Sequence, residues 1–317
     1  MQRLPALLAL LVVIAALLAG CGGNDQAADV NPAVTLALDF QPNAVHAGVF
    51  TTVERNLDAK QNLLLTVRAP AASTDSLKLL LSGGSDFSIV DIHDLGLARQ
   101  RGQDVVGVGA IVQRPLAAVI ASTKVSRPRD LEGRRVGVTG LPSDDAVLDS
   151  VVRADGGDPS KVRRITIGFS AVPSLAAGKV DAVVTFWNAE GVALKRRGVR
   201  TREFRVDDFG APRYPELVVA TKRSTLRKDP ARARRLVAAL AAGTRAALAN
   251  LPEASRLVAR RAEGDPALTL AQLRAVAPAF SPPLRLRRSA LEGWSRFDAR
   301  FGILKQRPDV GRAFTLR

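Results

Sequence analysis

Short apolar runs of strand type alternate with longer helix-type segments between residues 33 and 221. The first run, at 34–38, leads through a turn into a helix-type segment at 46–57, and a second strand follows at 63–67. Parallel strands need crossover connections, and helices usually supply them. The alternation therefore predicts an α/β fold built on mostly parallel sheets flanked by helices.

The same pattern repeats in the middle third, which indicates two lobes of similar design. Further strands are predicted at 87–90, 105–112, 162–167 and 181–185, and a turn leading into a strand is predicted at 130–138. A strand at 216–221 is predicted to return to the first lobe, and the last third reads as helices at 230–248, 253–261, 270–276 and 290–301. We therefore predict one lobe from 33–116 plus 218–317 and a second lobe from 117–217.

The N-terminus reads as a targeting segment. An almost unbroken apolar run at 4–18 follows Arg3, and it is too short for a comfortable membrane span. The sequence Leu-Ala-Gly-Cys at 18–21 resembles the bacterial lipobox, and Cys21 is the only cysteine in the chain. We predict a lipoprotein signal peptide at 1–20, an acylated Cys21 and a polar tether at 21–32. The mature protein is then expected outside the cytoplasm, anchored to the bacterial membrane by lipid.

The charge is large and unevenly distributed. The chain has 46 Lys and Arg against 30 Asp and Glu, a formal net charge of +16. Residues 222–317 hold 21 basic and 7 acidic residues. Aromatic residues are scarce there, whereas binding of single-stranded nucleic acid combines the two types, so we expect no nucleic-acid partner. The excess is either a solvated, arginine-biased surface or a face toward anionic lipid headgroups.

The scarcity of metal-binding side chains excludes further classes. One cysteine rules out an intramolecular disulfide framework, and two histidines make a multi-histidine metal centre improbable. We expect no metal and no cofactor.

Polar side chains gather where the predicted strands end. In open α/β sheets, ligands bind outside the carboxyl ends of the strands, so two facing lobes would form a cleft lined from both sides. The helix start at Ser143 would also offer free backbone N–H groups to a phosphate or carboxylate. The candidate binding residues are Asp39, Asn43, His46, Thr74, Asp91, Ser143, Asp144, Trp187, Asn188 and Glu190.

Several of these residues lie in motifs that resemble one known family. The segment 38–48 is similar to the opening motif of the thiamine-pyrimidine-precursor binding proteins. These belong to the ABC-transporter substrate-binding proteins, which include sulfonate and riboflavin binders. Further matches lie at 74–79, 140–145, 155–159, 168–173, 178–183 and 186–191. The resemblance covers roughly 34–250 and implies the two-lobed periplasmic-binding-protein fold of type 2, with a hinge and a ligand cleft between the lobes.

The resemblance also implies roles for individual residues. Asp39 and Asn43 would hydrogen-bond the ligand from the first lobe, Trp187 would stack on its ring, and Glu190 would accept from an exocyclic amine. Core packing for Trp187 and a surface helix-start charge for Glu190 are the structural alternatives. For His46, ligand contact and helix packing remain equally open.

The chain also departs from the family pattern. Phe40 stands where the family usually has Trp, and 54–58 replaces a Lys-Gly-aromatic turn, so the ligand could differ from the family's usual one. Related eukaryotic synthases hold pyridoxal phosphate on a lysine just after the third strand. The corresponding segment, 86–93, has no lysine, which argues against an enzyme.

We therefore expect a monomeric, extracytoplasmic solute-binding component of an ABC importer, with a permease and an ATPase as partners. It would capture a small nitrogen heterocycle of the thiamine-precursor type by hinge closure. A riboflavin or other flavin ligand, a sulfonate ligand, and a thiamine pyrimidine synthase-like enzyme are the alternatives.

Overall fold

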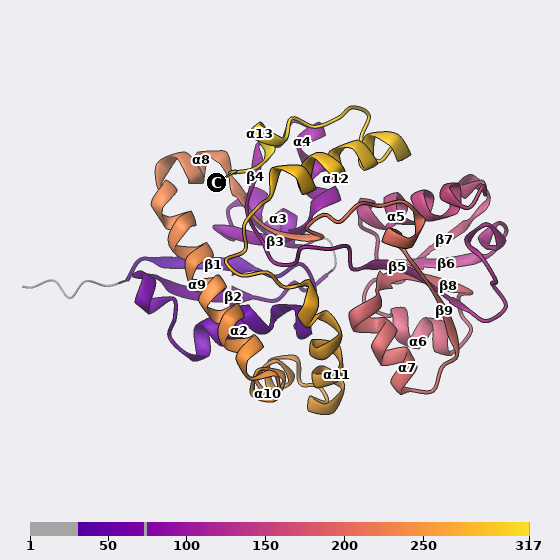
Figure 1. Cartoon of the computed structure of the whole chain (residues 1–317), viewed down its shortest axis with the longest axis horizontal. Helices are drawn as coiled ribbons and strands as arrows, with labels where there is room; N and C mark the ends of the chain where they lie inside the picture. Colours follow the sequence, from indigo (N-terminus) through magenta and orange to yellow (C-terminus); the bar gives the residue numbers. More distant parts are fainter. Residues whose placement is uncertain (1–30, 73–74, 317) are drawn as a thin grey trace, which may run out of the picture. The chain divides into compact units, whose positions relative to one another are not determined.

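The computed structural model describes residues 31–72 and 75–316, and Ala33–Arg317 forms one compact unit (Figure 1). The predicted signal peptide, Cys21, most of the tether and Thr74 lie outside the described residues. The strands are β1 (Ala33–Ala37), β2 (Leu64–Arg68), β3 (Phe87–Asp91), β4 (Val105–Ala110), β5 (Ala117–Ser122), β6 (Arg135–Val138), β7 (Arg163–Thr166), β8 (Ala182–Phe186), β9 (Thr201–Arg205) and β10 (Leu217–Lys222). The helices are α2 (Ala47–Glu54), α3 (Asp75–Ser82), α4 (Ile92–Gln100), α5 (Pro142–Ala154), α6 (Ala171–Ala176), α7 (Val192–Arg196), α8 (Arg223–Lys228), α9 (Pro230–Ala249), α10 (Leu251–Ala262), α11 (Pro266–Val276), α12 (Arg288–Phe301) and α13 (Val310–Ala313).

The first sheet has the strand order β2-β1-β3-β10-β4. β1 pairs in parallel with β2 and β3, whereas β10 runs antiparallel to β3 and β4. The central strands β3 and β10 are apolar runs buried along almost their whole length, as expected for strands covered by helices on both faces. On one side α2 and α9 pack so closely that a Cβ atom on Gly243 would lie 2.2 Å from the Gly48 carbonyl oxygen.

The second sheet has the order β7-β6-β8-β5-β9. β6 pairs in parallel with β7 and β8, and β5 runs antiparallel to β8 and β9. In each sheet, therefore, four strands point one way and one strand points the other. The reversed strands, β10 and β5, are the ones that the chain enters when it passes from one sheet to the other. The predicted α/β class with mostly parallel sheets is confirmed.

Two crossover segments, 111–116 and 206–216, carry the chain between the sheets (Figure 1). Glu216, fully buried, ties them together, because its Oε2 accepts from the backbone N–H of Leu116 at 2.9 Å. This is where a hinge between two lobes would have to bend. The division into lobes at 33–116 plus 218–317 and at 117–217 stays a prediction.

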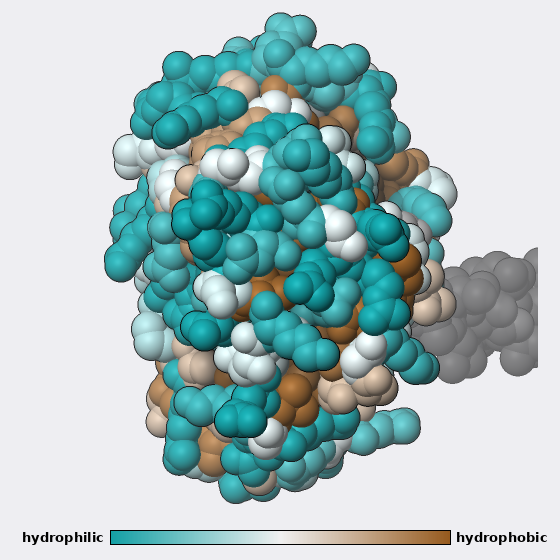
Figure 2. All heavy atoms as spheres, turned by 90° about the vertical axis from the view of Figure 1, so that its right-hand side faces the viewer, coloured by the Kyte–Doolittle hydropathy of each residue, from teal (hydrophilic) through white to brown (hydrophobic). Residues whose placement is uncertain are grey.

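The surface beside the second sheet is mostly hydrophilic, with apolar residues in separate spots (Figure 2). Among the described residues, the exposed large hydrophobic side chains are Leu64 and Ile165. In the same part of the chain, no helix combines the length and apolar character that crossing a bilayer requires.

Candidate functional site

A cavity of about 320 Å³ lies where strands of both sheets end. Its walls come from the turn after β1, the end of β3, the start of α4, the loop from β6 into α5, and the end of β8 with the π-helical turn η5 (Trp187–Gly191) that follows. The volume is at the small end of the range for ligand pockets, about 300–1,000 Å³. The predicted site residues that line it are Asp39, Asn43, Asp91, Ser143, Asp144 and Glu190.

Asp39 is held in place by His46, which is completely buried beneath it. His46 is the N-cap residue of α2, and its Nδ1 accepts from the backbone N–H of Asn43 at 3.2 Å. That bond leaves the proton on Nε2, which donates to Asp39 Oδ1 at 2.8 Å. The Asn43 side chain accepts from the N–H of Val45 at 2.9 Å. His46 thus orients a cavity carboxylate without lining the cavity itself.

Replacing His46 by Ala is expected to lower both stability and ligand affinity. The change removes two hydrogen bonds and a buried ring, so the free energy of unfolding should fall by about 2 kcal/mol. Asp39 would also lose its orientation. Urea unfolding measures the first effect and calorimetric ligand titration the second. His46→Gln, whose amide can still donate, should retain more affinity than His46→Ala, and equal affinities of the two variants would contradict the orienting role.

The N-terminus of α5 is capped from the opposite side of the cavity. Its N-cap residue is Leu141, whose side chain has no acceptor atom. Asp94, in the first turn of α4, supplies the acceptor: its Oδ1 accepts from Ser143 N at 3.1 Å and its Oδ2 from Ser143 Oγ at 2.9 Å. Asp94 and Ser143 are both buried. A backbone N–H that the sequence offers to an anionic ligand is therefore already bound to a carboxylate of the protein.

Asp144 is the next residue after Ser143, and its side chain is bound by the residues that precede α5. Its Oδ2 accepts from the N–H and the hydroxyl of Thr139, both at 2.6 Å, and from Gly140 N at 3.1 Å. Burial raises the pKa of Asp94 to about 7, with the negative charge of Asp91 adding to the shift. Burial likewise raises the pKa of Asp144 to about 7. The two carboxyl groups therefore titrate near neutral pH.

Glu190 approaches the cavity from the side of the second sheet. Its Oε2 accepts from Thr185 Oγ1 at 2.6 Å and from Phe186 N at 3.3 Å. Burial raises the pKa of Glu190, and the negative charge of Asp39 contributes in the same direction. The charge of Asp39 thus acts on Glu190 across the cavity.

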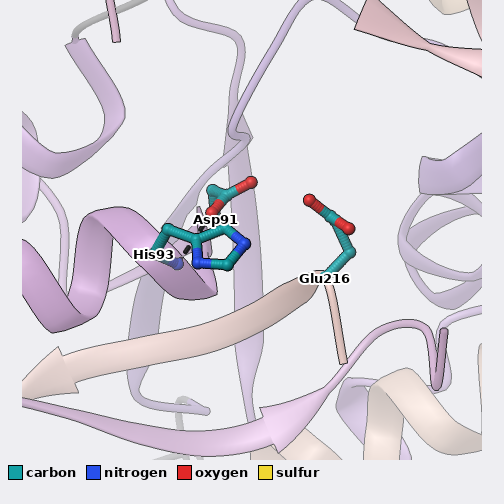
Figure 3. A group of neighbouring side chains, drawn as sticks. All are labelled: Asp91, His93 and Glu216. Atoms are coloured by element: carbon teal, nitrogen blue, oxygen red, sulfur yellow. Dashed lines mark hydrogen bonds between the residues drawn. The ribbon is translucent and has the colours of Figure 1, made fainter. Parts of the chain in front are cut away.

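Asp91 leads from the cavity to a buried network (Figure 3). Asp91, His93 and Glu216 bring potential ligand atoms within 4.8 Å of one another. His93 is fully buried, and its Nδ1 pairs with Asp298 Oδ1 at 2.9 Å while its Nε2 lies 3.0 Å from the Tyr214 hydroxyl. Both ring nitrogens of His93 are thus already engaged with protein groups.

The network raises the pKa values of both Asp91 and His93. Burial, followed by the negative charge of Glu216, raises the pKa of Asp91 well above its ordinary value. Burial by itself would lower the pKa of His93, but the charge of Asp298 and its hydrogen bond outweigh that and raise the pKa to about 10. The cluster is therefore a charged hydrogen-bond network at the crossover.

Trp187 and Asn188 lie outside the cavity lining. Trp187 is buried, its Nε1 donates to Pro115 O at 3.2 Å, and the Arg205 guanidinium lies 4.3 Å from the centroid of its ring. Stacking of a ligand on Trp187 stays a prediction, and the aromatic residues that line the cavity are Phe40 and Phe186. Asn188 is fully buried, and no described residue pairs with its amide.

The sequence reading missed Asp94 and Glu216. The sequence places Glu216 at the start of a predicted strand, and no motif singles out Asp94. Only the meeting of α4 with α5, and of the two crossover segments, gives these residues their partners. Acidic residues inside otherwise apolar segments are the one signal that could have drawn attention to them.

Comparison with solved structures identifies the class of fold. The periplasmic aliphatic sulphonate-binding protein of Escherichia coli matches with a TM-score of 0.70 at 15% identity, over 89% of this chain and 97% of that one. The protein therefore has the periplasmic-binding-protein fold. It belongs to the NMT1/THI5-like family, whose model matches residues 43–255. The predicted family resemblance is confirmed.

Relatives within the family include a binding protein and an enzyme. A formylaminopyrimidine-binding protein of Halalkalibacterium halodurans is 32% identical over 68% of this chain and 66% of its own length. A 4-amino-5-hydroxymethyl-2-methylpyrimidine phosphate synthase of Legionella pneumophila is 23% identical over 56% of each chain. The matched region spans less than two thirds of both relatives.

Proposed function

We propose that this chain captures a small amino-substituted pyrimidine outside the cytoplasm and delivers it to an ABC importer. The acidity of the cavity is the observation that carries this proposal. Among the described residues, its lining has two cations, Lys78 and Arg101, both on exposed side chains. Against them stand five carboxyl groups, Asp39, Asp91, Asp94, Asp144 and Glu190. Such a lining favours ligands rich in N–H donors or positive charge.

An aminopyrimidine fits this lining in chemistry and size. Its exocyclic amine and ring nitrogens would hydrogen-bond Asp39 and Asn43 on one wall and Glu190 on the other. Phe40 and Phe186 supply apolar surface for a flat ring. A cavity of about 320 Å³ suits a single substituted ring better than the three fused rings of a flavin. The formylaminopyrimidine-binding relative supports the same ligand class.

Sulfonate binding and the synthase reaction would each require the cavity to bind an anionic group. This cavity is instead lined by carboxyl groups. A sulfonate would use a helix N-terminus such as that of α5, and Asp94 already occupies the Ser143 N–H there. A synthase would have to hold the phosphate of pyridoxal phosphate against the same negative charge. In the family's synthases the active-site lysine comes just after the third strand. The lysine that lines this cavity, Lys78, lies on α3, before that strand.

Ligand titration tests this proposal. We expect 4-amino-5-hydroxymethyl-2-methylpyrimidine or its formylamino analogue to bind and to raise the melting temperature, and an alkanesulfonate and riboflavin to leave it unchanged. Glu190→Gln should weaken binding by about tenfold to a hundredfold, since a charge-assisted hydrogen bond contributes roughly 1.5–3 kcal/mol. The exposed Glu253→Gln serves as the matched control. Binding of the sulfonate alone would overturn the assignment.

The same proposal includes a lipid anchor on Cys21 and docking to a permease with its ATPase. The supporting observation is the lipobox-like sequence at 18–21, together with membership of a family that contains solute-binding proteins. Mass spectrometry of the protein from its native membrane should find diacylglyceryl at Cys21. An unmodified N-terminus upstream of Cys21 would refute the anchor.

A further inference from the structure

A buried hydrogen-bonded contact joins the two walls of the cavity at one rim. Asp94 belongs to α4, which follows β3 of the first sheet, and Ser143 belongs to α5, which follows β6 of the second sheet. Two hydrogen bonds, at 3.1 and 2.9 Å, connect them. We propose that Asp94 is a latch residue, which closes the cavity by capping α5 from the opposite wall and thereby determines how tightly the ligand is held.

The geometry makes this cap specific to the closed state. Leu141 cannot cap α5 itself, so the Ser143 N–H depends on an acceptor brought by another element. If the sheets swing apart, Asp94 and Ser143 separate, and both have to find water instead. The contact therefore favours closure and has no counterpart when the cavity is open. A local cap, which moves with its own helix, would not discriminate between the two states.

Two other contacts join the same two parts of the chain. The ring of Phe40, after β1, meets the ring of Phe169, after β7, edge to face with centroids 4.3 Å apart. At the far end of α5, Arg153 Nη1 donates to the Phe301 carbonyl oxygen of α12 at 2.5 Å. Asp94 differs from these because it is both buried and part of the cavity lining. A ligand in the cavity would therefore be shut in by the latch.

The affinity of a ligand that binds only the closed state scales with the fraction of protein that is closed. Losing the latch should reduce that fraction and release the ligand faster, although Asp39, Asn43 and Glu190 are unchanged. The latch rests on the proposed function only for the identity of the ligand. Closure itself can be measured without one.

The test compares Asp94→Ala with Asp94→Asn in the full chain, purified in mild detergent. Asn keeps an acceptor for Ser143 N and an amide N–H for Ser143 Oγ, so it should restore what Ala removes. Asp145→Ala is the control, because Asp145 lies in the same turn of α5, is exposed and pairs with Arg164. Hydrogen exchange of the 139–148 peptide, the radius of gyration from X-ray scattering, and titration with 4-amino-5-hydroxymethyl-2-methylpyrimidine are the three measurements.

We expect Asp94→Ala to speed exchange at the start of α5 by about tenfold, to increase the radius of gyration and to weaken probe binding by about tenfold. Wild-type exchange and an unchanged radius in a folded Asp94→Ala protein would overturn the latch. Asp94→Ala could change hydrogen exchange and the radius of gyration while the pyrimidine probe binds neither the wild type nor the variant. That result would support the latch and refute the ligand assignment of the proposed function.

Discussion

The protein is expected to be more stable at pH 5 than at pH 8. Burial raises the pKa of Asp94 and of Asp144 from 3.8 to about 7. Between pH 3.8 and about pH 7, these two carboxyl groups keep their protons in the folded protein but have released them in the unfolded chain. Each carboxyl therefore removes about 1.4 kcal/mol of stability per pH unit as the pH rises through this window, and the loss levels off above about pH 7.

His93 also makes the protein less stable as the pH rises, but over a higher pH range. Its pKa is raised from 6.5 to about 10, chiefly by the charge of Asp298, which outweighs the opposing effect of burial. The stability that it contributes is complete below about pH 6.5 and is lost as the pH rises toward 10. The exposed carboxyls with lowered pKa values, such as Asp104 and Asp158, affect stability only at and below the ordinary pKa range of a carboxyl and do not offset this slope.

Thermal unfolding followed by circular dichroism between pH 5 and 8 measures this effect. We expect the melting temperature to fall by several degrees over the interval, since about 1 kcal/mol corresponds to roughly 2–4 °C in a protein larger than about 150 residues. Asp144→Asn should flatten the slope, and Asp145→Asn, at the exposed neighbouring position, should not. A melting temperature that rises from pH 5 to pH 8 would contradict the assignment.

Replacing His93 by Ala is expected to be the most destabilising single change considered. His93 is the cation at the centre of the buried network, paired with Asp298 at 2.9 Å and close to Asp91 and Glu216. Without it, buried carboxylates lose their counter-charge and the Tyr214 hydroxyl loses its partner. Breaking a buried ion pair in this way lowers the free energy of unfolding by about 3–5 kcal/mol.

That loss is a large part of the roughly 5–15 kcal/mol by which proteins of this kind are stable. Urea unfolding provides the measurement. His46→Ala is the matched control, because the two histidines are equally buried but His46 has a single carboxylate partner. If His93→Ala were no more destabilising than His46→Ala, the network would not hold the charges assigned to it.

Much of the candidate cavity could be read from the sequence, for a local reason. The candidates that line it lie at the end of a strand or within the turn or helix start that follows one, and strand ends of an α/β sheet meet on one edge. They are Asp39, Asn43, Asp91, Ser143, Asp144 and Glu190. His46 was left undecided because its partner Asp39 is seven residues away, and no periodicity states which way a buried ring points. The sequence could not show that the Arg205 guanidinium lies over the Trp187 ring, because only the fold brings these two residues together.

By itself, the sequence determined the alternation of strands and helices, the α/β class and the family, because these depend on periodicity and on short motifs along the chain. The tertiary structure decided which strands reverse, how Asp94 comes to cap α5, and why Asp91, His93, Glu216 and Asp298 share one buried cluster. Such contacts join residues up to 205 positions apart. Their energies depend on burial and on nearby charges, and both exist only after the two sheets and the crossover segments have packed together.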